Sequence, residues 1–330
     1  MDEKGVIRFF NGFLEEKALK SSALPQSGSS RKNYIVENSQ HKYVVTYNSN
    51  KSENQSFFYF SQVFSELNLN TPKIFKINED ENLYIQSFLG SDTLSDIIIK
   101  EGESDRVKML VESALQNLFI LQKATENKVD YTKTFEYKSY DTLPILNDLF
   151  YFKNFFIDVL EIPYHKATLI SEFLELIKII EKLEPKGLML RDFQARNIMV
   201  DNDAIFFIDY QAAMEGPLMY DIVSFLFQGK ANFTENFKDE MLAFYIKLWE
   251  NEEIENQLKS SLKPLQLIRF LQVLGAYGFR GLVQKKSHFL ASIERGVANI
   301  QNFSNSWEKM KSFPELKKLI ENIDVNTYKG

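Results

Sequence analysis

The pattern of apolar and polar residues changes after about residue 89. Before that point, short runs of alternating or β-branched and aromatic residues predict strands at 33–37, 42–47, 73–78 and 82–88. Helical periodicity in the same part predicts helices at 5–20 and 57–67, and the polar stretch 21–31 is expected to be a flexible loop.

After residue 90 the apolar positions recur mostly at helical spacing. Helices are predicted at 93–100, 104–125, 143–160, 166–183 and through most of the chain after residue 220, with one β-rich island at 187–208. The pattern therefore predicts an α+β fold. A small antiparallel β-sheet lobe, residues 1–89, precedes a larger and mainly helical lobe, residues 90–330.

Composition narrows the functional classes. The 330 residues carry a net charge of −6 without a basic stripe or polybasic segment, which argues against nucleic-acid and membrane partners. There is no cysteine, and the three histidines (His41, His165 and His288) lack ligand spacing, so a zinc site is not expected. No apolar run approaches the ~20 residues of a spanning helix, and no secretory signal precedes the first helix, so a cytoplasmic protein is expected.

One segment carries candidate chemistry. Asp192 and Asn197 bracket a four-residue loop, and a short strand and a turn lead to the apolar strand 204–208, which ends at Asp209. Protein kinases have the same order of residues, with a catalytic Asp, an Asn five residues later and a further metal-binding Asp. Phosphoryl transfer requires a group that orients the attacking hydroxyl and oxygen ligands for magnesium. A turn cap or surface carboxylate is the alternative for each residue alone.

Further residues extend this pattern along the chain. The loop begins Arg191-Asp192 and ends Arg196-Asn197, and the strand continues Ile208-Asp209-Tyr210-Gln211. An aromatic run lies at 149–156, and Gly275, Arg280 and Lys285 follow later. With these residues, the stretch 187–226 resembles the aminoglycoside phosphotransferase and choline kinase superfamily. It is most similar to the bacterial sugar kinases that phosphorylate N-acetylmuramate and N-acetylglucosamine at the anomeric hydroxyl.

The resemblance implies a two-lobed, protein-kinase-like fold and an ATP-dependent kinase that acts on a small hydroxyl compound, an amino sugar in particular. It makes Asp192 the catalytic base and Asn197 and Asp209 the ligands of Mg²⁺. The residues expected to cover the nucleotide phosphates are Ser27, Gly28, Ser29, Ser30, Arg31 and Lys32. The residues expected to contact the acceptor are Arg196, Gln211, Asn147 and Asp148.

Several of these residues also have a simple structural explanation. A stretch rich in Ser and Gly is often only a flexible loop, and polar residues such as Asn147, Asp148 and Gln211 often only solvate a helix surface. Arg196 is expected either to neutralise a phosphate or a sugar carboxylate, or to form an ion pair with Asp209, Glu215 or Asp221.

The chain departs from the kinase pattern in one respect, because the strand 42–47 lacks the lysine expected to hold the nucleotide phosphates. Arg31 or Lys32, one strand earlier, is expected to supply that cation. Because this lysine is missing, one alternative is a pseudokinase that binds nucleotide without turnover. An aminoglycoside-like or choline-like alcohol kinase is the other alternative. The sequence does not determine the acceptor, the choice between ATP and GTP, or the oligomeric state.

Overall fold

The computed structural model describes residues 2–13, 17–25, 31–229 and 231–324. Contacts between Cα atoms divide the chain into two compact units, residues 1–138 with 190–214, and residues 139–189 with 215–330. The segment that carries Asp192, Asn197 and Asp209 belongs to the first unit. The boundary at residue 89, expected between a nucleotide lobe and an acceptor lobe, stays a prediction.

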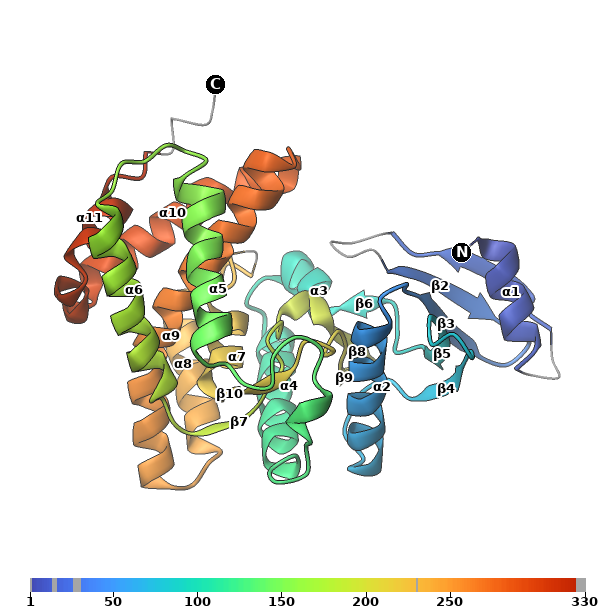
Figure 1. The fold of residues 1–330 in the computed structure, drawn as a ribbon. Coiled ribbons are helices and arrows are strands. Elements are labelled where there is room, and N and C mark those ends of the chain that lie inside the picture. Colours follow the sequence, from blue (N-terminus) through green and yellow to red (C-terminus); the bar gives the residue numbers. More distant parts are fainter. Residues whose placement is uncertain (1, 14–16, 26–30, 230, 325–330) are drawn as a thin grey trace. The chain divides into compact units, whose positions relative to one another are not determined.

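The first unit is built on an antiparallel sheet in the order β1-β2-β3-β5-β4 (Figure 1). The strands are β1 (Lys20–Ala23), β2 (Lys32–Glu37), β3 (Lys42–Tyr47), β4 (Ile74–Ile77) and β5 (Leu83–Ser87). Its helices are α1 (Glu3–Asn11), α2 (Lys51–Glu66), α3 (Leu94–Glu101) and α4 (Asp105–Ala124), with a 3₁₀ turn at Tyr131–Lys133. The four strands predicted before residue 89 are confirmed to within two residues.

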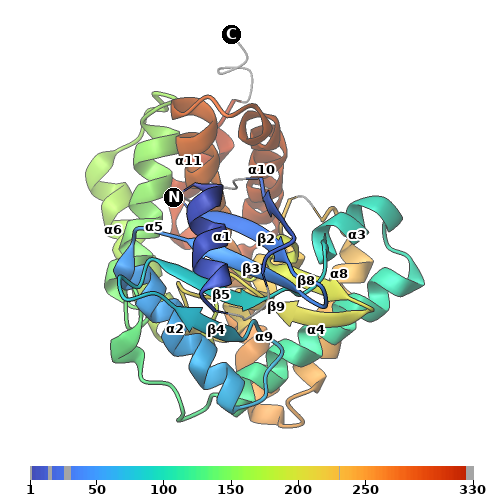
Figure 2. The ribbon, with the colours of Figure 1, turned by 90° about the vertical axis from the view of Figure 1, so that its right-hand side faces the viewer.

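Each face of this sheet is covered by a different helix. Tyr34, Val45 and Ile85 are register partners, so their side chains share one face, where they pack with Val6 and Phe10 of α1. Figure 2 shows α1 lying across this sheet. Thr46 and Tyr84 are also partners and therefore point to the opposite face. There α2 packs through Phe57, whose ring lies 5.4 Å from that of Tyr84.

Three elements in this unit differ from the prediction. Helix α2 begins at Lys51 rather than at residue 57. The first helix ends at Asn11 rather than at residue 20, and the backbone N–H of Ala18 donates to the side chain of Asn11. The chain then forms β1 inside the stretch expected to be a loop, because Ser22 pairs with Ile35 of β2. Four largely exposed residues, Lys-Ser-Ser-Ala, form a strand through this edge pairing and not through their own periodicity.

A second small sheet carries the candidate chemistry. It contains β6 (Asp92–Thr93), β8 (Ile198–Asp201) and β9 (Ala204–Phe207), and the 3₁₀ turn η3 (Ala195–Asn197) leads into β8. Gly90, at the start of this region, has φ +88°, and a Cβ there would lie 2.9 Å from the carbonyl oxygen of Val200. Only glycine tolerates both the positive φ and the close approach to Val200, and it therefore allows the chain to enter the small sheet here.

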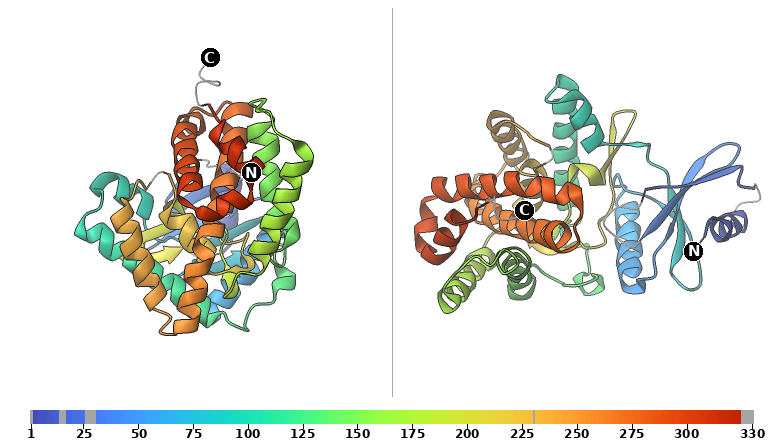
Figure 3. Two further views of the ribbon diagram at one scale, coloured as in Figure 1. Left: turned by 90° about the vertical axis from the view of Figure 1, so that its left-hand side faces the viewer. Right: turned by 90° about the horizontal axis from the view of Figure 1, so that it is seen from above.

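The second unit is mostly helical, as predicted. Its helices are α5 (Thr142–Phe152), α6 (Lys166–Glu181), α7 (Met219–Leu226), α8 (Glu235–Lys247), α9 (Glu252–Tyr277), α10 (Ser287–Ser306) and α11 (Pro314–Glu321), with a 3₁₀ turn at Glu308–Ser312. The strands β7 (Lys186–Met189) and β10 (Met214–Pro217) form a two-stranded sheet. The long helix α9 packs against α5, α7 and α10 (Figure 3). No helix within the described ranges is long and apolar enough to cross a membrane.

Two π-helical turns interrupt helices that sequence periodicity predicts to be regular. The predicted helix 143–160 is α5 followed by the π-helix η2 (Lys153–Ile157), and α9 continues into a second π-helix, η4 (Gly278–Val283). The two turns pack together so closely that a Cβ added at Gly278 would overlap the carbonyl oxygen of Phe155. A Cβ at Gly275 would lie 2.8 Å from the backbone nitrogen of Phe152. Glycine at both positions permits this close approach.

Candidate active site

The candidate catalytic loop has a strained start. Arg191 has φ +71°, a left-handed conformation that a non-glycine residue seldom adopts. The backbone N–H of Asp192 donates to the carbonyl oxygen of Leu190 at 2.8 Å, which tightens the turn. Strained conformations of this kind cost about 1–3 kcal/mol and cluster at functional sites. The turn therefore supports a special role for Asp192.

Three side chains hold the carboxylate of Asp192. It accepts hydrogen bonds from Gln194 Nε2 at 2.7 Å, from Arg196 Nη2 at 3.0 Å and from Asn197 Nδ2 at 3.2 Å. The side chain is 33% exposed, so the carboxylate stays accessible while these donors fix its orientation. Arg196 forms an ion pair as one alternative expected, but its partner is Asp192 and not Asp209, Glu215 or Asp221.

Asn197 links this loop to the strand that leads to Asp209. It is 8% exposed, and its Nδ2 donates to the carbonyl oxygen of Asp192 at 2.9 Å as well as to its carboxylate. The backbone N–H of Ile208 donates to the carbonyl oxygen of Asn197 at 3.0 Å, next to the β8–β9 pair Ile198–Phe207. The structure thus brings Asp192, Asn197 and Asp209 together on two neighbouring backbone segments.

Asp209 is the second strained residue, with φ +65°. Its Oδ1 accepts hydrogen bonds from Arg31 Nη1 and from Gln211 Nε2, both at 3.0 Å. The side chain of Asp209 is 38% exposed. Gln211, which is expected to contact the acceptor, lies within the first unit and is a buried neighbour of Asp209. Its contact with an acceptor stays a prediction.

The buried guanidinium of Arg31 joins two carboxylates. Besides Asp209, it donates through Nη2 to Glu53 Oε1 at 2.8 Å, and the Arg31 side chain is only 9% exposed. Asn48 Nδ2 donates to the other oxygen of Glu53 at 2.9 Å. In protein kinases a strand lysine pairs with a helix glutamate. Here Arg31 precedes β2 and pairs with the first turn of α2.

Sequence reasoning missed Glu53, although a signal was present. Asn50 caps α2 and accepts a hydrogen bond from the backbone N–H of Glu53. Asn followed three residues later by Glu is a helix-start spacing. The sequence pattern predicts that this helix begins at residue 57, which excludes its first turn and the carboxylate of Glu53.

Lys32 is exposed at the start of β2, and the expected phosphate-covering residues Ser27, Gly28, Ser29 and Ser30 lie outside the described residues.

Helix α2 also fixes the backbone beyond Asp209. Ser56 Oγ donates to the carbonyl oxygen of Gln211 at 2.8 Å, and the hydroxyls of Ser61 and Tyr210 are 2.7 Å apart. The rings of Phe57 and Tyr210 are stacked with centroids 5.0 Å apart. Burial raises the pKa of Tyr210 and, mainly for the same reason, raises that of Tyr84 to about 12. Both phenols are therefore neutral packing groups at physiological pH.

The two remaining acceptor candidates belong to the second unit. Asn147 is exposed on α5. Asp148 is only 3% exposed, and Tyr140 donates its hydroxyl to Asp148 Oδ2 at 2.8 Å. Asp148 therefore does not lie on a solvated helix surface, and it already has a hydrogen-bond partner inside its own unit.

The donor set fits a magnesium ion that is bound together with phosphate. Among the described residues, the Asn197 side chain donates through Nδ2 and the Asp209 side chain accepts through Oδ1, so Asn197 Oδ1 and Asp209 Oδ2 have no partner there. Both are oxygen donors of the kind that Mg²⁺ prefers. Within the described ranges, no group of three or more His, Cys, Asp and Glu could hold a metal. A bound ion would therefore need phosphate and water oxygens as further ligands.

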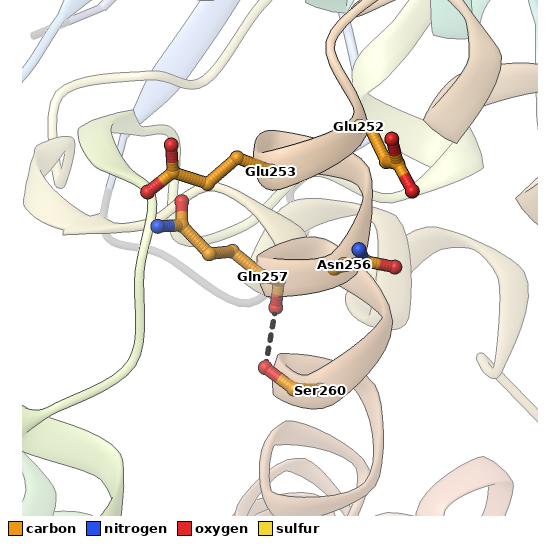
Figure 4. Close-up of a pocket in the computed structure, with 5 residues that line it drawn as sticks. All are labelled: Glu252, Glu253, Asn256, Gln257 and Ser260. Carbon is orange, nitrogen blue, oxygen red and sulfur yellow. Dashed lines mark hydrogen bonds between the residues drawn. The ribbon is translucent and has the colours of Figure 1, made fainter.

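A surface depression of about 570 Å³ lies elsewhere, at the start of α9 (Figure 4). It is lined by Glu252, Glu253, Asn256, Gln257 and Ser260. These residues come from the first turns of one helix and are exposed, except for the half-buried Gln257. The depression is open surface and includes none of the candidate catalytic residues.

Comparison with known proteins places the chain in a family. Residues 23–256 match the model of the phosphotransferase enzyme family. An N-acetylmuramate/N-acetylglucosamine kinase of Neisseria meningitidis serogroup B is 25% identical over 185 residues. That match covers 55% of this chain and spans about half (52%) of the relative.

Solved structures of kinases have the same fold. The amicoumacin kinase hAmiN, in complex with AMP-PNP, Ca²⁺ and Ami, has a TM-score of 0.67 at 13% identity, with 93% of this chain and 94% of that chain covered. The choline kinase LicA of Streptococcus pneumoniae has a TM-score of 0.62 at 15% identity, with 91% and 99% covered. These likenesses confirm the expected α+β, protein-kinase-like fold. The chain belongs to the phosphotransferase enzyme family.

Proposed function

We propose that this chain is an ATP-dependent kinase that transfers the γ-phosphate to a hydroxyl of an amino sugar. The observation that carries the proposal is the convergence of Asp192, Asn197 and Asp209, joined by the Ile208–Asn197 backbone bond and by the Asn197–Asp192 side-chain bond. Family membership supports phosphoryl transfer. The sugar kinase of Neisseria supports the amino sugar.

In this proposal Asp192 orients the acceptor hydroxyl and accepts its proton. Gln194, Arg196 and Asn197 hold the carboxylate in one orientation, so little reorganisation is needed at the moment of attack. Asn197 Oδ1 and Asp209 Oδ2 would hold Mg²⁺. When bound, that ion offsets negative charge on the transferring phosphoryl group.

Arg31 takes the role of the missing strand lysine. Its guanidinium is held by Glu53 beside the proposed metal ligand Asp209, where the nucleotide phosphates would lie. Lys32 and the segment 27–30 stay candidates for further phosphate contacts. A phosphate-binding role for Arg31, supplied from the position before β2, supports an active kinase over a pseudokinase.

Acceptor contacts are proposed from Arg196, Gln211 and Asn147, with Asp148 as a buried support. Residues 1–89 are proposed to bind the nucleotide, and the helical lobe from residue 90 is proposed to bind the acceptor. A cytoplasmic location and a small-molecule partner accord with this proposal. An aminoglycoside-like or choline-like acceptor is the second candidate, supported by the folds of the choline kinase LicA and of hAmiN.

An acceptor panel tests the proposal. ADP release would be measured with ATP and Mg²⁺ against N-acetylmuramate, N-acetylglucosamine, choline and an aminoglycoside, each with and without EDTA. We expect EDTA-sensitive ADP release with an amino sugar above the rate without acceptor. Faster release with choline or the aminoglycoside would favour the second candidate, and a rate independent of every acceptor would refute the kinase assignment for this panel.

A further inference from the structure

The contacts of Arg31 are unusual for a residue next to a metal ligand. Its guanidinium lies between Glu53 Oε1 at 2.8 Å and Asp209 Oδ1 at 3.0 Å, and its Cζ atom is 5.9 Å from the centre of the Phe57 ring. A buried arginine requires compensating charge. Here one of the carboxylates that compensate its charge is the one proposed to bind Mg²⁺.

The two ion pairs of Arg31 differ in strength. Glu53 is 17% exposed, and its second oxygen is fixed by Asn48, whose Nδ2 also donates to Asn54 Oδ1. Glu53 also lies in the first turn of α2, where the helix dipole favours a negative charge. Asp209 is 38% exposed. Because solvent screens the more exposed pair, Glu53 is the anchor of Arg31 and Asp209 is the weaker partner.

A divalent ion on Asp209 would conflict with this arrangement. Arg31 Nη1 and Gln211 Nε2 already share Asp209 Oδ1. An ion bound at the same carboxylate would lie within a few ångströms of the guanidinium, and like charges at such a distance repel. A triphosphate would remove the conflict, because its oxygens bind both the ion and a guanidinium.

We propose that Arg31 is an exchangeable counter-ion of Asp209. In the nucleotide-free protein it neutralises the carboxylate; when Mg²⁺ arrives with the nucleotide, Asp209 passes to the ion while Arg31 stays on Glu53 and binds the phosphates. This inference rests on the proposed function and adds an order of binding to it. A divalent ion alone binds weakly, and nucleotide and metal enter together.

The alternative is a permanent clamp, in which Arg31 only joins α2 to the strand end. The exchangeable counter-ion and the permanent clamp predict different effects of Arg31→Gln on the affinity for a divalent ion alone and on the affinity for the metal–nucleotide complex. Under exchange, the variant binds a divalent ion alone more tightly, because Asp209 has lost its competitor, but binds the metal–nucleotide complex more weakly, because the phosphates have lost a partner. Under a permanent clamp, both affinities move in the same direction or neither moves.

Electron paramagnetic resonance of Mn²⁺ measures both affinities without turnover. Free Mn²⁺ is titrated with the full chain, alone and with AMP-PNP, for the wild type, Arg31→Gln and Lys51→Gln. Lys51→Gln is the matched control, because it removes one exposed positive charge near Glu53 on the same helix turn. Relative to that control, we expect Arg31→Gln to tighten Mn²⁺ alone about fivefold, the worth of a partly exposed ion pair. It should weaken the Mn²⁺–AMP-PNP complex about tenfold or more.

Two further variants keep the outcomes separate. Glu53→Gln removes the anchor, so Arg31 should hold Asp209 more tightly and Mn²⁺ alone should bind more weakly; unchanged or tighter binding overturns exchange, even if Arg31→Gln does not fold. Asp209→Asn tests the metal site itself. If it leaves both affinities unchanged, the proposed function is wrong. If it lowers both while Arg31→Gln shows no opposite shifts, only exchange is wrong.

Discussion

The substitution Asp192→Asn separates catalysis from binding. The amide keeps the shape of the side chain but cannot take a proton, and its nitrogen cannot accept the hydrogen bonds that Gln194, Arg196 and Asn197 now donate. Only its one oxygen can meet these three donors. The variant should fold, because the Asp192 side chain is 33% exposed and Arg196 can remain solvated.

The expected loss can be bounded from general-base catalysis. A positioned base contributes about 10²- to 10⁴-fold, or about 2.7–5.4 kcal/mol of transition-state stabilisation. We expect the rate of phosphoryl transfer to fall within that range. The described contacts of the proposed metal ligand Asp209 are with Arg31 and Gln211, so the affinity for Mg²⁺–nucleotide should stay within about threefold of the wild type.

Rapid-quench single-turnover experiments with γ-labelled ATP measure the transfer rate, and fluorescence titration with a nucleotide analogue measures the affinity. Asp201→Asn is the matched control, because it removes an exposed carboxylate from the end of β8. A transfer rate for Asp192→Asn within tenfold of this control would refute the assignment of Asp192 as base. An equal loss of rate and of nucleotide affinity would show that Asp192 belongs to the binding site instead.

Three other predictions concern stability and support of the site. Gly278→Ala should lower the free energy of unfolding by about 1–3 kcal/mol in urea, because its Cβ overlaps a facing carbonyl, whereas Gly12→Ala should change it far less. Between pH 10 and 12 the free energy of unfolding should fall less steeply with pH for Tyr84→Phe than for the wild type, by about 1.4 kcal/mol per pH unit. The native phenol, with its pKa raised to about 12, keeps a proton that the unfolded chain releases in this range. Arg196→Gln should lower the transfer rate about tenfold or less, because Asp192 keeps two donors.

The alkaline prediction has a defined sign. Stability from a raised phenol pKa is fully present below pH 10 and is lost as the pH rises toward 12. Urea unfolding followed at pH 9, 10 and 11 measures the slope for Tyr84→Phe and for the wild type. Equal slopes in the two proteins would contradict the burial of this phenol.

Local sequence patterns predicted the secondary structure around Asp192, Asn197 and Asp209 well. The strands around these residues are short and apolar, and Asp192 and Asn197 lie within six residues of chain, so no distant contact was needed to find them. The same holds for β2, β3 and β5, whose alternating residues cover both faces of the sheet. Local periodicity determined these elements.

Long-range contacts determined what the sequence could not show. Arg31 meets Asp209, which lies 178 residues later, and this pairing has no local signature. The edge strand β1 forms through its partner, and the π-helical turns depend on close packing at Gly278 and Phe155. Asp148 is buried and accepts a hydrogen bond from Tyr140, which helical periodicity does not reveal.

Phosphorus NMR of one reaction mixture tests phosphoryl transfer most directly. With the chain, Mg²⁺, ATP and the preferred amino sugar, the γ-phosphate resonance should disappear as a phosphate monoester resonance of equal intensity grows beside ADP. A doublet from coupling to the anomeric proton would place the phosphate on the anomeric oxygen. If the γ-phosphate instead appears only as inorganic phosphate, or ATP stays intact, the chain does not transfer phosphate to that acceptor.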